Sequence, residues 1–325
     1  MAINWSETQP AGNADKSWQT ATISGDGTKA LAGINTGRLY YYNGSSWDEV
    51  QPGGDSNYTW NTCAMSNDGS DIIAGVTSGR LYHSTDSGAN WTEIRPGGSD
   101  SNYTWSGSSM SDDGSKILVC ANGYRFFKST DSGANWTEFT PAGDANRNWV
   151  SCAMSDDGDV MAVSRTEYEV WYTKNGGTNW TQRTSGGITG GNNTFYGVHI
   201  SKDGNNIIHT VNNSQYVSVS TDSGDNWSNI TVNNASSYAW WPCSITDSGK
   251  ALIGINASTG RLWYSDDSGD NWGEEQPAGN VNRRWRALAI SNDGSKMIAA
   301  ALFTRLYFGS QEVTPTNTSN FFQLL

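Results

Sequence analysis

The amino-acid sequence predicts an all-β protein built from seven copies of one repeat. A turn of the form Ser-x-Asp-Gly, or a close variant, recurs at intervals of 42 to 46 residues, and a tryptophan that ends a short polar stretch recurs with it. The turns begin at Ser24, Ser66, Ser111, Ser155, Ser201, Thr246 and Ser291, and the tryptophans are Trp5, Trp47, Trp91, Trp136, Trp180, Trp227 and Trp272. Because two independent markers give the same count, we treat almost the whole chain as one repeat array.

The composition favours the same class and excludes two kinds of partner. The 325 residues include 37 Gly, 16 Trp and 14 Tyr, which is too aromatic for a disordered chain and too rich in glycine for a helical one. The formal net charge of -12 argues against nucleic acid, because a phosphate backbone requires clustered cations. The apolar runs are only a handful of residues long, so we expect no insertion into a membrane.

Each repeat contains four segments with the character of short strands. In the second repeat these are residues 60–66, 71–77, 79–84 and 92–95, separated by turns rich in Gly, Asp and Ser. Runs of this length, rich in β-forming residues and divided by turn residues, predict a four-stranded antiparallel sheet. Seven such sheets cannot bury two apolar faces alone, so we expect them to stack around an axis as a seven-bladed β-propeller.

The two ends of the chain complement each other. Residues 3–10 match residues 270–277, the fourth strand of a repeat, but no first three strands precede them. The last repeat, 285–310, lacks a fourth strand. We therefore predict that the N-terminal strand completes the last blade and closes the ring, which removes two exposed sheet edges.

These matches predict one propeller over residues 1–310, followed by a C-terminal tail, 311–325. The predicted blades are 11–51, 52–96, 97–141, 142–184, 185–232 and 233–277, and the seventh combines the inner strands in 278–310 with the outer strand in 1–10.

Four of the tryptophan segments read Ser-x-Asp-x-Gly-x-x-Trp, namely 84–91, 129–136, 220–227 and 265–272. This motif resembles the Asp-box, or BNR repeat, of sialidase-like propellers, and the resemblance implies that each box joins the third and fourth strands, far from the ligand face. We expect a structural role, because Asp accepts N–H bonds within the turn, Gly supplies a positive φ and Trp covers the hairpin. The residues concerned are Asp86, Asp131, Asp222 and Asp267 with Trp91, Trp136, Trp180, Trp227 and Trp272.

The face opposite the boxes carries the longer linkers between blades, and we predict ligand binding there. The aromatic candidates are Trp18, Trp60, Trp105, Trp149, Trp240 and Trp285 with Tyr58 and Tyr103, and the cationic candidates are Arg38, Arg80, Arg125 and Arg261. A flat ring beside guanidinium and amide groups suits a sugar, whose C–H face stacks while its hydroxyls exchange hydrogen bonds. The alternative is that the rings wedge between blades and the arginines bind neighbouring loops.

The sequence favours a protein without catalytic activity. The resemblance to sialidases implies an N-terminal Arg-Ile-Pro motif, which is absent. A glycoside hydrolase remains an alternative, because it needs only two carboxylates across a cleft. By location alone the candidates are Asp100, Asp144, Glu167 and Glu169.

We predict neither a cofactor nor a metal. The three histidines show no metal-ligand spacing, and the four cysteines contain no Cys-x-x-Cys pair. Cys63, Cys152 and Cys243 share one repeat position and thus lie in different blades, so we expect buried free thiols.

Two functional hypotheses follow. In the first, a lectin-like propeller binds a glycan or surface polysaccharide and gains avidity from repeated sites. In the second, an assembly scaffold docks a protein partner through its face or through residues 311–325, whose end is apolar. The chain is similar in size and repeat to the seven-bladed Asp-box assembly factor of photosystem II. Residues 1–10 lack a secretory signal, and the Ser/Thr/Asn/Gly-rich composition favours a virion-surface, adhesion or released extracellular protein.

Overall fold

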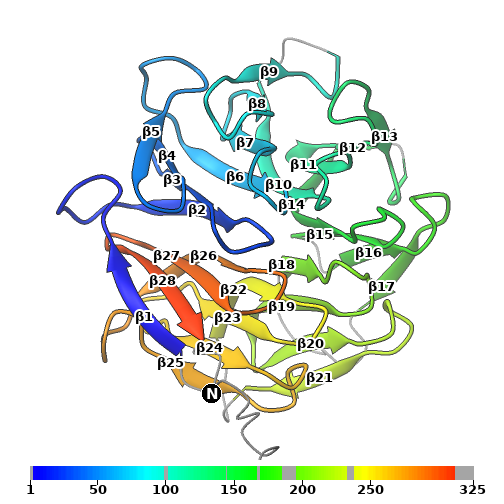
Figure 1. Ribbon diagram of the computed structural model, residues 1–325. Coiled ribbons are helices and arrows are strands. Elements are labelled where there is room, and N and C mark those ends of the chain that lie inside the picture. The colour runs from blue at the N-terminus through cyan, green and yellow to red at the C-terminus, as the bar shows by residue number, and fades with distance from the viewer. Residues whose placement is uncertain are drawn as a thin grey trace, which may run out of the picture.

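The computed structural model describes residues 3–98, 102–143, 145–166, 169–184, 195–232 and 238–311. These ranges form 28 β-strands, which are arranged as sheets around a common centre (Figure 1). The described part of the chain contains no helix long and apolar enough to cross a membrane.

The strands fall into seven groups of four, numbered here along the chain. Group one is β2 (Trp18–Ile23), β3 (Ala30–Ile34), β4 (Leu39–Tyr42) and β5 (Trp47–Val50). Group two is β6 (Trp60–Met65), β7 (Ile72–Val76), β8 (Leu81–Ser84) and β9 (Thr92–Ile94). Group three is β10 (Thr104–Met110), β11 (Ile117–Tyr124), β12 (Phe126–Ser129) and β13 (Thr137–Phe139). Group four is β14 (Arg147–Met154), β15 (Met161–Arg165), β16 (Glu169–Thr173) and β17 (Thr181–Thr184).

Group five is β18 (Phe195–Ile200), β19 (Ile207–Ser214), β20 (Tyr216–Ser220) and β21 (Ser228–Thr231). Group six is β22 (Tyr238–Ile245), β23 (Ala251–Ile255), β24 (Leu262–Ser265) and β25 (Gly273–Glu275). Group seven is β26 (Arg284–Ile290), β27 (Lys296–Leu302) and β28 (Leu306–Gln311) together with β1 (Ile3–Thr8).

Within every group the strands pair antiparallel in sequence order, except that β1 joins β28 from the other end of the chain. The β1–β28 register runs from Ile3 opposite Gln311 to Thr8 opposite Leu306. Two pairs of groups share a continuous hydrogen-bonded sheet, through β11–β14 and through β19–β22. The innermost strands contact one another in the order β2, β6, β10, β14, β18, β22 and β26, and β26 contacts β2.

The apolar core lies between the sheets. It divides into seven clusters, each formed by residues of two neighbouring groups, including one cluster that joins group seven to group one. The packing of strand β27 explains its apolar run 297–302: Met297 and Ala299 belong to the cluster shared with group six, while Ile298 and Ala300 belong to the cluster shared with group one. Alternate residues point to opposite faces of a strand, and both faces are covered here.

The turn between β8 and β9 shows how the Ser-x-Asp-x-Gly-x-x-Trp segments fold. Asp86 Oδ1 accepts hydrogen bonds from the Ser84 hydroxyl (2.9 Å) and the Asn90 backbone N–H (2.8 Å), and Oδ2 accepts from Asn90 Nδ2 (2.6 Å). These bonds, led by the Asn90 side chain, lower the pKa of Asp86. Asp131, Asp222 and Asp267 accept the same set of bonds in their turns.

Two successive residues of this turn lie in the left-handed region. Gly88 has a φ of 80°, as the sequence suggests, and Ser87 before it has a φ of 60°. Ser132, Ser223 and Ser268 repeat this conformation in the other three turns. The positive φ of the serine is not evident from the motif, because L-residues other than Asn and Asp seldom adopt it.

Replacing Gly88 by Ala should destabilise the protein by about 1–2 kcal/mol, the cost of placing an L-residue in the left-handed region. The cost is conformational, because the nearest atom to the added Cβ would be Val50 Cγ1 at an ordinary 3.5 Å. Denaturant unfolding measures the difference. Gly273→Ala is the matched control: its φ is not positive, its added Cβ would meet only Tyr264 O at 3.9 Å, and equal losses for both variants would contradict this account.

Candidate functional site

The six tryptophans predicted to bind a ligand are buried. Trp18, Trp60, Trp105, Trp149, Trp240 and Trp285 are each at most 2% exposed. Each belongs to a core cluster between two groups, and a Cβ at Gly33 or Gly75 in the preceding group would meet the side chain of Trp60 or Trp105. A sugar needs a free ring face, so these indoles cannot provide the predicted stacking surface. They wedge between sheets, which was the alternative interpretation.

The predicted arginines are bound by the protein itself. Each lies near a glutamate of the fourth strand of its own group, at N–O distances of 3.4 to 3.6 Å: Arg38 with Glu49, Arg80 with Glu93, Arg125 with Glu138 and Arg261 with Glu274. Arg305, at the equivalent place in group seven, lies 3.5 Å from Glu7 of β1. Arg38 and Arg261 also bind the next linker through Asp55 and Asn280. These arginines tie turns to linkers rather than presenting free cations.

The two predicted tyrosines are likewise engaged. The Tyr58 hydroxyl donates to the carbonyl oxygen of Gly53 (2.9 Å), and Tyr103 stacks on Tyr124 at a centroid distance of 4.2 Å. Backbone bridges join Tyr58 to Gly37 and Tyr103 to Gly79, so each linker is fixed to the second turn of the preceding group.

Of the four carboxylates considered for hydrolysis, only Glu169 lies among the described residues. Its Oε2 accepts from Arg165 Nη1 (2.8 Å) and from Trp171 Nε1 (3.1 Å), which ties it into its own sheet. Asp100, Asp144 and Glu167 lie outside the described residues. The tail 311–325 lies outside them as well, apart from Gln311.

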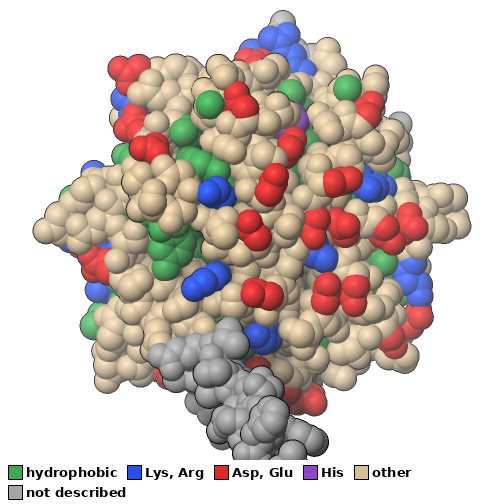
Figure 2. All heavy atoms as spheres, viewed as in Figure 1, with side chains coloured by type: hydrophobic (Ala, Val, Ile, Leu, Met, Phe, Trp, Pro, Cys, Tyr) green, Lys and Arg blue, Asp and Glu red, His purple; other side chains and the backbone are tan. Residues whose placement is uncertain are grey.

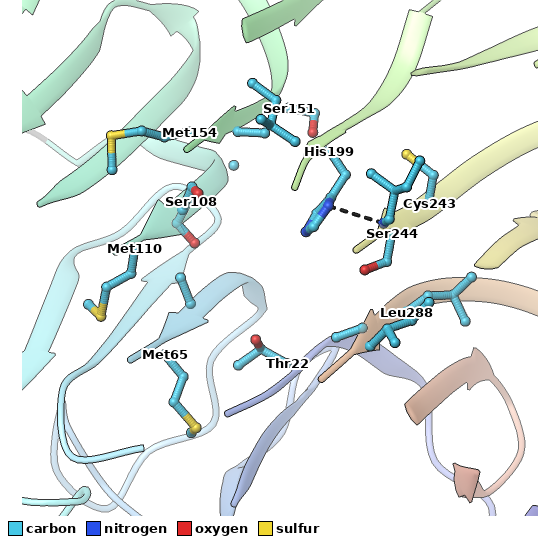
Figure 3. A pocket seen from close by; sticks show the side chains of 18 of the residues that line it. Thr22, Met65, Ser108, Met110, Ser151, Met154, His199, Cys243, Ser244 and Leu288 are labelled. Carbon is cyan, nitrogen blue, oxygen red and sulfur yellow. Dashed lines mark hydrogen bonds between the residues drawn. The ribbon is translucent and has the colours of Figure 1, made fainter. Parts of the chain in front are cut away.

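The innermost strands of all seven groups surround a central cavity of about 230 Å³. Figure 3 shows its lining around an open centre, where Thr22, Ser108 and Ser151 carry hydroxyl groups and Leu288 an apolar side chain, while the Met65 side chain points away from the centre into the core between groups one and two. The cavity therefore has a mixed polar and apolar wall, with one histidine in it.

That histidine, His199, is held neutral. Its Nδ1 accepts a hydrogen bond from the backbone N–H of Ile245 (3.2 Å), drawn as the dashed line in Figure 3. Burial is the main cause that lowers its pKa to about 4, and the charge of Lys202 adds to the effect. At neutral pH the ring carries no charge, so His199 adds no positive charge to the wall of the cavity.

One end of the cavity lies at the Ser-x-Asp-Gly turns, and the second residues of four of these turns line it: Gly25, Lys202, Asp247 and Asn292. We call the second residues of all seven turns the turn ring, which consists of Gly25, Asn67, Asp112, Asp156, Lys202, Asp247 and Asn292. Hydrogen bonds link neighbouring turns, for example from Asn67 N to Asp112 O (2.9 Å), from Asp156 N to Lys202 O (2.8 Å) and from Asn292 N to Gly25 O (2.8 Å).

Side chains of the turn ring also meet across the axis. Lys202 Nζ lies 2.8 Å from Asp112 Oδ1 and donates to the carbonyl oxygen of Met110 (2.9 Å). Asn292 Nδ2 donates to Asp112 Oδ2 (2.8 Å). These residues belong to groups three, five and seven, which are not neighbours, so their contacts span the central space and obstruct this end of it.

The other end of the innermost strands carries a second ring. In each of these strands a β-bulge follows directly after the repeated aromatic residue. The bulged residues are Gln19, Asn61, Ser106, Val150, Tyr196, Trp241 and Arg286, which we call the bulge ring; β22 also bulges at Pro242. A bulge re-aims a side chain. The bulge thus allows the aromatic side chain to point into the core while the side chain of the next residue points in a different direction.

The bulge ring has two unlike halves. In the first half, polar groups reach from one group to the next: Gln19 Nε2 donates to Asn61 Oδ1 (2.9 Å), Asn61 Nδ2 to Trp105 O (2.7 Å) and Ser106 Oγ to Trp149 O (2.8 Å). In the second half, Tyr196 stacks on Trp241 and Arg286 lies over Trp241. Tyr196, Trp241 and Arg286 are partly exposed.

Sequence reasoning missed both rings, although a signal for each is present. The second residue of the Ser-x-Asp-Gly turns and the residue after the repeated aromatic vary from copy to copy, while their neighbours repeat. Variable positions inside an otherwise regular motif are free of the packing that the repeat imposes.

The described residues offer no place for a metal ion that three or more His, Cys, Asp or Glu side chains could hold. The four cysteines are free thiols. Burial raises the pKa of Cys63 and of Cys243 to about 12, so neither is a thiolate at neutral pH.

Replacing Gly25 by Ala should destabilise the protein by about 0.5–1.5 kcal/mol, because the side chains of Asn67 and Asn292 must move and the hydrogen bond from Asn292 to Asp112 is lost. The added Cβ would overlap Asn67 Oδ1 and lie 2.6 Å from Asn292 Nδ2. Denaturant unfolding of Gly25→Ala in the wild type and in an Asn67→Ala/Asn292→Ala background tests this. The penalty should shrink in that background, and an unchanged penalty would show that the turn ring is not its cause.

Stability should fall as the pH drops from about 6.5 to about 4, because unfolded His199 takes up a proton that folded His199 refuses. In His199→Gln this part of the pH dependence should disappear, as measured by the free energy of unfolding at neutral pH and at about pH 5. His83→Gln is the control: it removes a different histidine whose pKa is also lowered, so the His199 contribution should persist. An unchanged pH profile in His199→Gln would contradict the assignment.

Comparison with known proteins gives the fold and no closer relation. No family model matches the chain, and no curated protein matches it. Among solved structures, "YCF48 bound to D1 peptide" superposes with a TM-score of 0.70 at 14% sequence identity, over 95% of this chain and 97% of that one. YCF48 from Cyanidioschyzon merolae gives a TM-score of 0.68 at 12% identity, over 94% and 98%. At these identities the likeness establishes architecture alone: the chain folds as a β-propeller.

Proposed function

We propose that this chain is a non-catalytic binding scaffold built as a closed propeller of seven four-stranded blades. Three observations support the closed ring: the circular contacts of the innermost strands, the core cluster between groups seven and one, and the pairing of β1 with β28. The turns around Asp86 and its three equivalents act as Asp-boxes, which hold the third and fourth strands of a blade together.

The scaffold binds a segment of a protein partner at the bulge ring. The observation that carries this proposal is that the repeated aromatic and arginine residues serve the fold, whereas the bulged residues vary and include partly exposed rings. Recognition residues are commonly found where a rigid scaffold presents irregular side chains. The structural neighbour YCF48, described as bound to a peptide, supports a propeller of this shape as a peptide binder.

The face of the molecule shown in Figure 2 is largely polar. Asp and Glu side chains are spread over it, with Lys and Arg among them and apolar side chains only in small areas. This face therefore shows no large apolar patch of the kind that marks a hydrophobic interface.

Glycan recognition is a second candidate, and the partly exposed side chains of Tyr196, Trp241 and Arg286 favour it. Tyr196 stacks on Trp241 and Arg286 lies over it, so the stack offers a sugar the edge of the indole and the guanidinium donors rather than a free face of Trp241. Such a site occurs once, rather than at each of the repeated tryptophans.

Screening the folded protein against a displayed library of random peptides and against a glycan array tests both candidates. We expect peptides to be selected and their affinity to fall about tenfold in Trp241→Ala, the loss of one aromatic anchor worth roughly 1–2 kcal/mol. Thr85→Ala, an exposed change in a turn between β8 and β9, should leave binding unchanged. Binding of glycans alone would replace the first candidate with the second, and peptide binding insensitive to Trp241→Ala would move the site elsewhere.

A further inference from the structure

Three planar side chains of the bulge ring form one stack. The rings of Tyr196 and Trp241 are nearly parallel, with centroids 4.0 Å apart and an interplanar angle of 10°. On Trp241 lies the guanidinium of Arg286, whose Cζ is 4.0 Å from the ring centroid. The three residues come from the innermost strands of groups five, six and seven, and each occupies the bulge of its strand. The stack is therefore assembled by the fold from three separate repeats.

Arg286 differs from the arginines that hold the turns and linkers. Arg38, Arg80, Arg125, Arg261 and Arg305 each have a glutamate within 3.6 Å. Within the described ranges Arg286 has no carboxylate partner, and its titratable neighbours are Arg284, another cation, and Tyr196. Burial, followed by the Arg284 charge, lowers the pKa of Arg286 to about 10, so it still carries its charge at neutral pH.

The contact with Trp241 engages the face of the Arg286 guanidinium, and no described residue accepts a hydrogen bond from its N–H groups. An arginine held over an aromatic face is attracted through its charge and not through its N–H groups. Those groups point outward in the plane of the guanidinium, where they form a rigid fork. Such a fork matches the two oxygens of a carboxylate and binds them through two parallel hydrogen bonds.

We propose that the Tyr196–Trp241–Arg286 stack is a carboxylate-binding site, filled by an Asp or Glu side chain or by the terminal carboxylate of the bound protein segment. A carboxylate matches the single fork of Arg286, and the positive charge of the exposed Arg284 adds attraction. The source of the carboxylate rests on the function proposed above, whereas the binding chemistry of the stack does not.

The first experiment tests the chemistry without a partner. The protein is labelled with ¹⁵N-arginine, and the Nε–H resonance of Arg286, assigned from its loss in Arg286→Gln, is followed during titration with sodium acetate. Sodium chloride at equal ionic strength is the control. We expect a saturating shift with acetate and no comparable shift with chloride, and the same result in Arg284→Gln. An equal response to both salts, or no response to acetate, would overturn the proposal.

The second experiment identifies the source of the carboxylate. Each peptide selected by the wild-type protein is compared with versions in which Asp and Glu are replaced by Asn and Gln, or in which the C-terminus is amidated. Whichever change removes the recognised carboxylate should weaken binding about tenfold, and Arg286→Gln should abolish this difference. Arg286→Lys should restore only part of it, because an ammonium lacks the fork.

The two experiments separate two kinds of failure. If no peptide binds but Arg286 responds to acetate, the proposed function is wrong and the carboxylate site stands. If peptides bind equally well in acidic and amide form, or if the preference survives Arg286→Gln, the stack is not the carboxylate site.

Discussion

The structure depends on the need of every sheet to cover both of its faces. Strand β27 alternates between two clusters, with Met297 directed to group six and Ile298 to group one. A sheet of this kind has no solvent face, so it is stable only between two neighbours. The same requirement applies to the first and the last sheet, and the cluster that contains both Trp18 and Ile298 meets it. The pairing of β1 with β28 then joins the chain ends at the same place.

Because both faces of each sheet are buried, few side chains of the strands can vary without disturbing the packing. The β-bulges create positions that can vary. Trp60 must enter the space between groups one and two, where Gly33 leaves room for it. A regular strand would direct Asn61 to the opposite face, into the next interface. The bulge instead aims Asn61 at its neighbours around the centre, where it accepts from Gln19. Each repeat therefore contributes one packing residue and one freely variable residue at adjacent positions.

This division explains what the sequence could and could not predict. The strands and turns were predictable because they depend on local patterns: β7 occupies 72–76 within the expected 71–77, and Asp86 binds its own turn. The role of Trp60 was not predictable in this way, because its exposure depends on residues of another sheet, Leu31, Leu39 and Tyr41, which are distant along the chain. The same holds for Arg38, whose partner Glu49 becomes a neighbour only when β4 pairs with β5. Residue type alone suggested a ligand site where the fold uses both side chains internally.

The polar side chains of the turn ring and of the bulge ring find their hydrogen-bond and ion-pair partners differently. This difference singles out Arg286, which lacks a carboxylate partner among the described residues. In the turn ring, the cation of Lys202 has the carboxylate of Asp112 and a carbonyl oxygen as partners. In the first half of the bulge ring, amides and a hydroxyl bind one another or a carbonyl oxygen. Arg286 is partly buried and, within the described residues, faces a ring and another cation instead of a carboxylate. Withdrawing a charge from water without a counter-ion costs free energy. The turn arginines Arg38, Arg80, Arg125, Arg261 and Arg305 each have a glutamate of the protein nearby. Arg286 has no such partner among the described residues, so we infer that a ligand supplies its carboxylate.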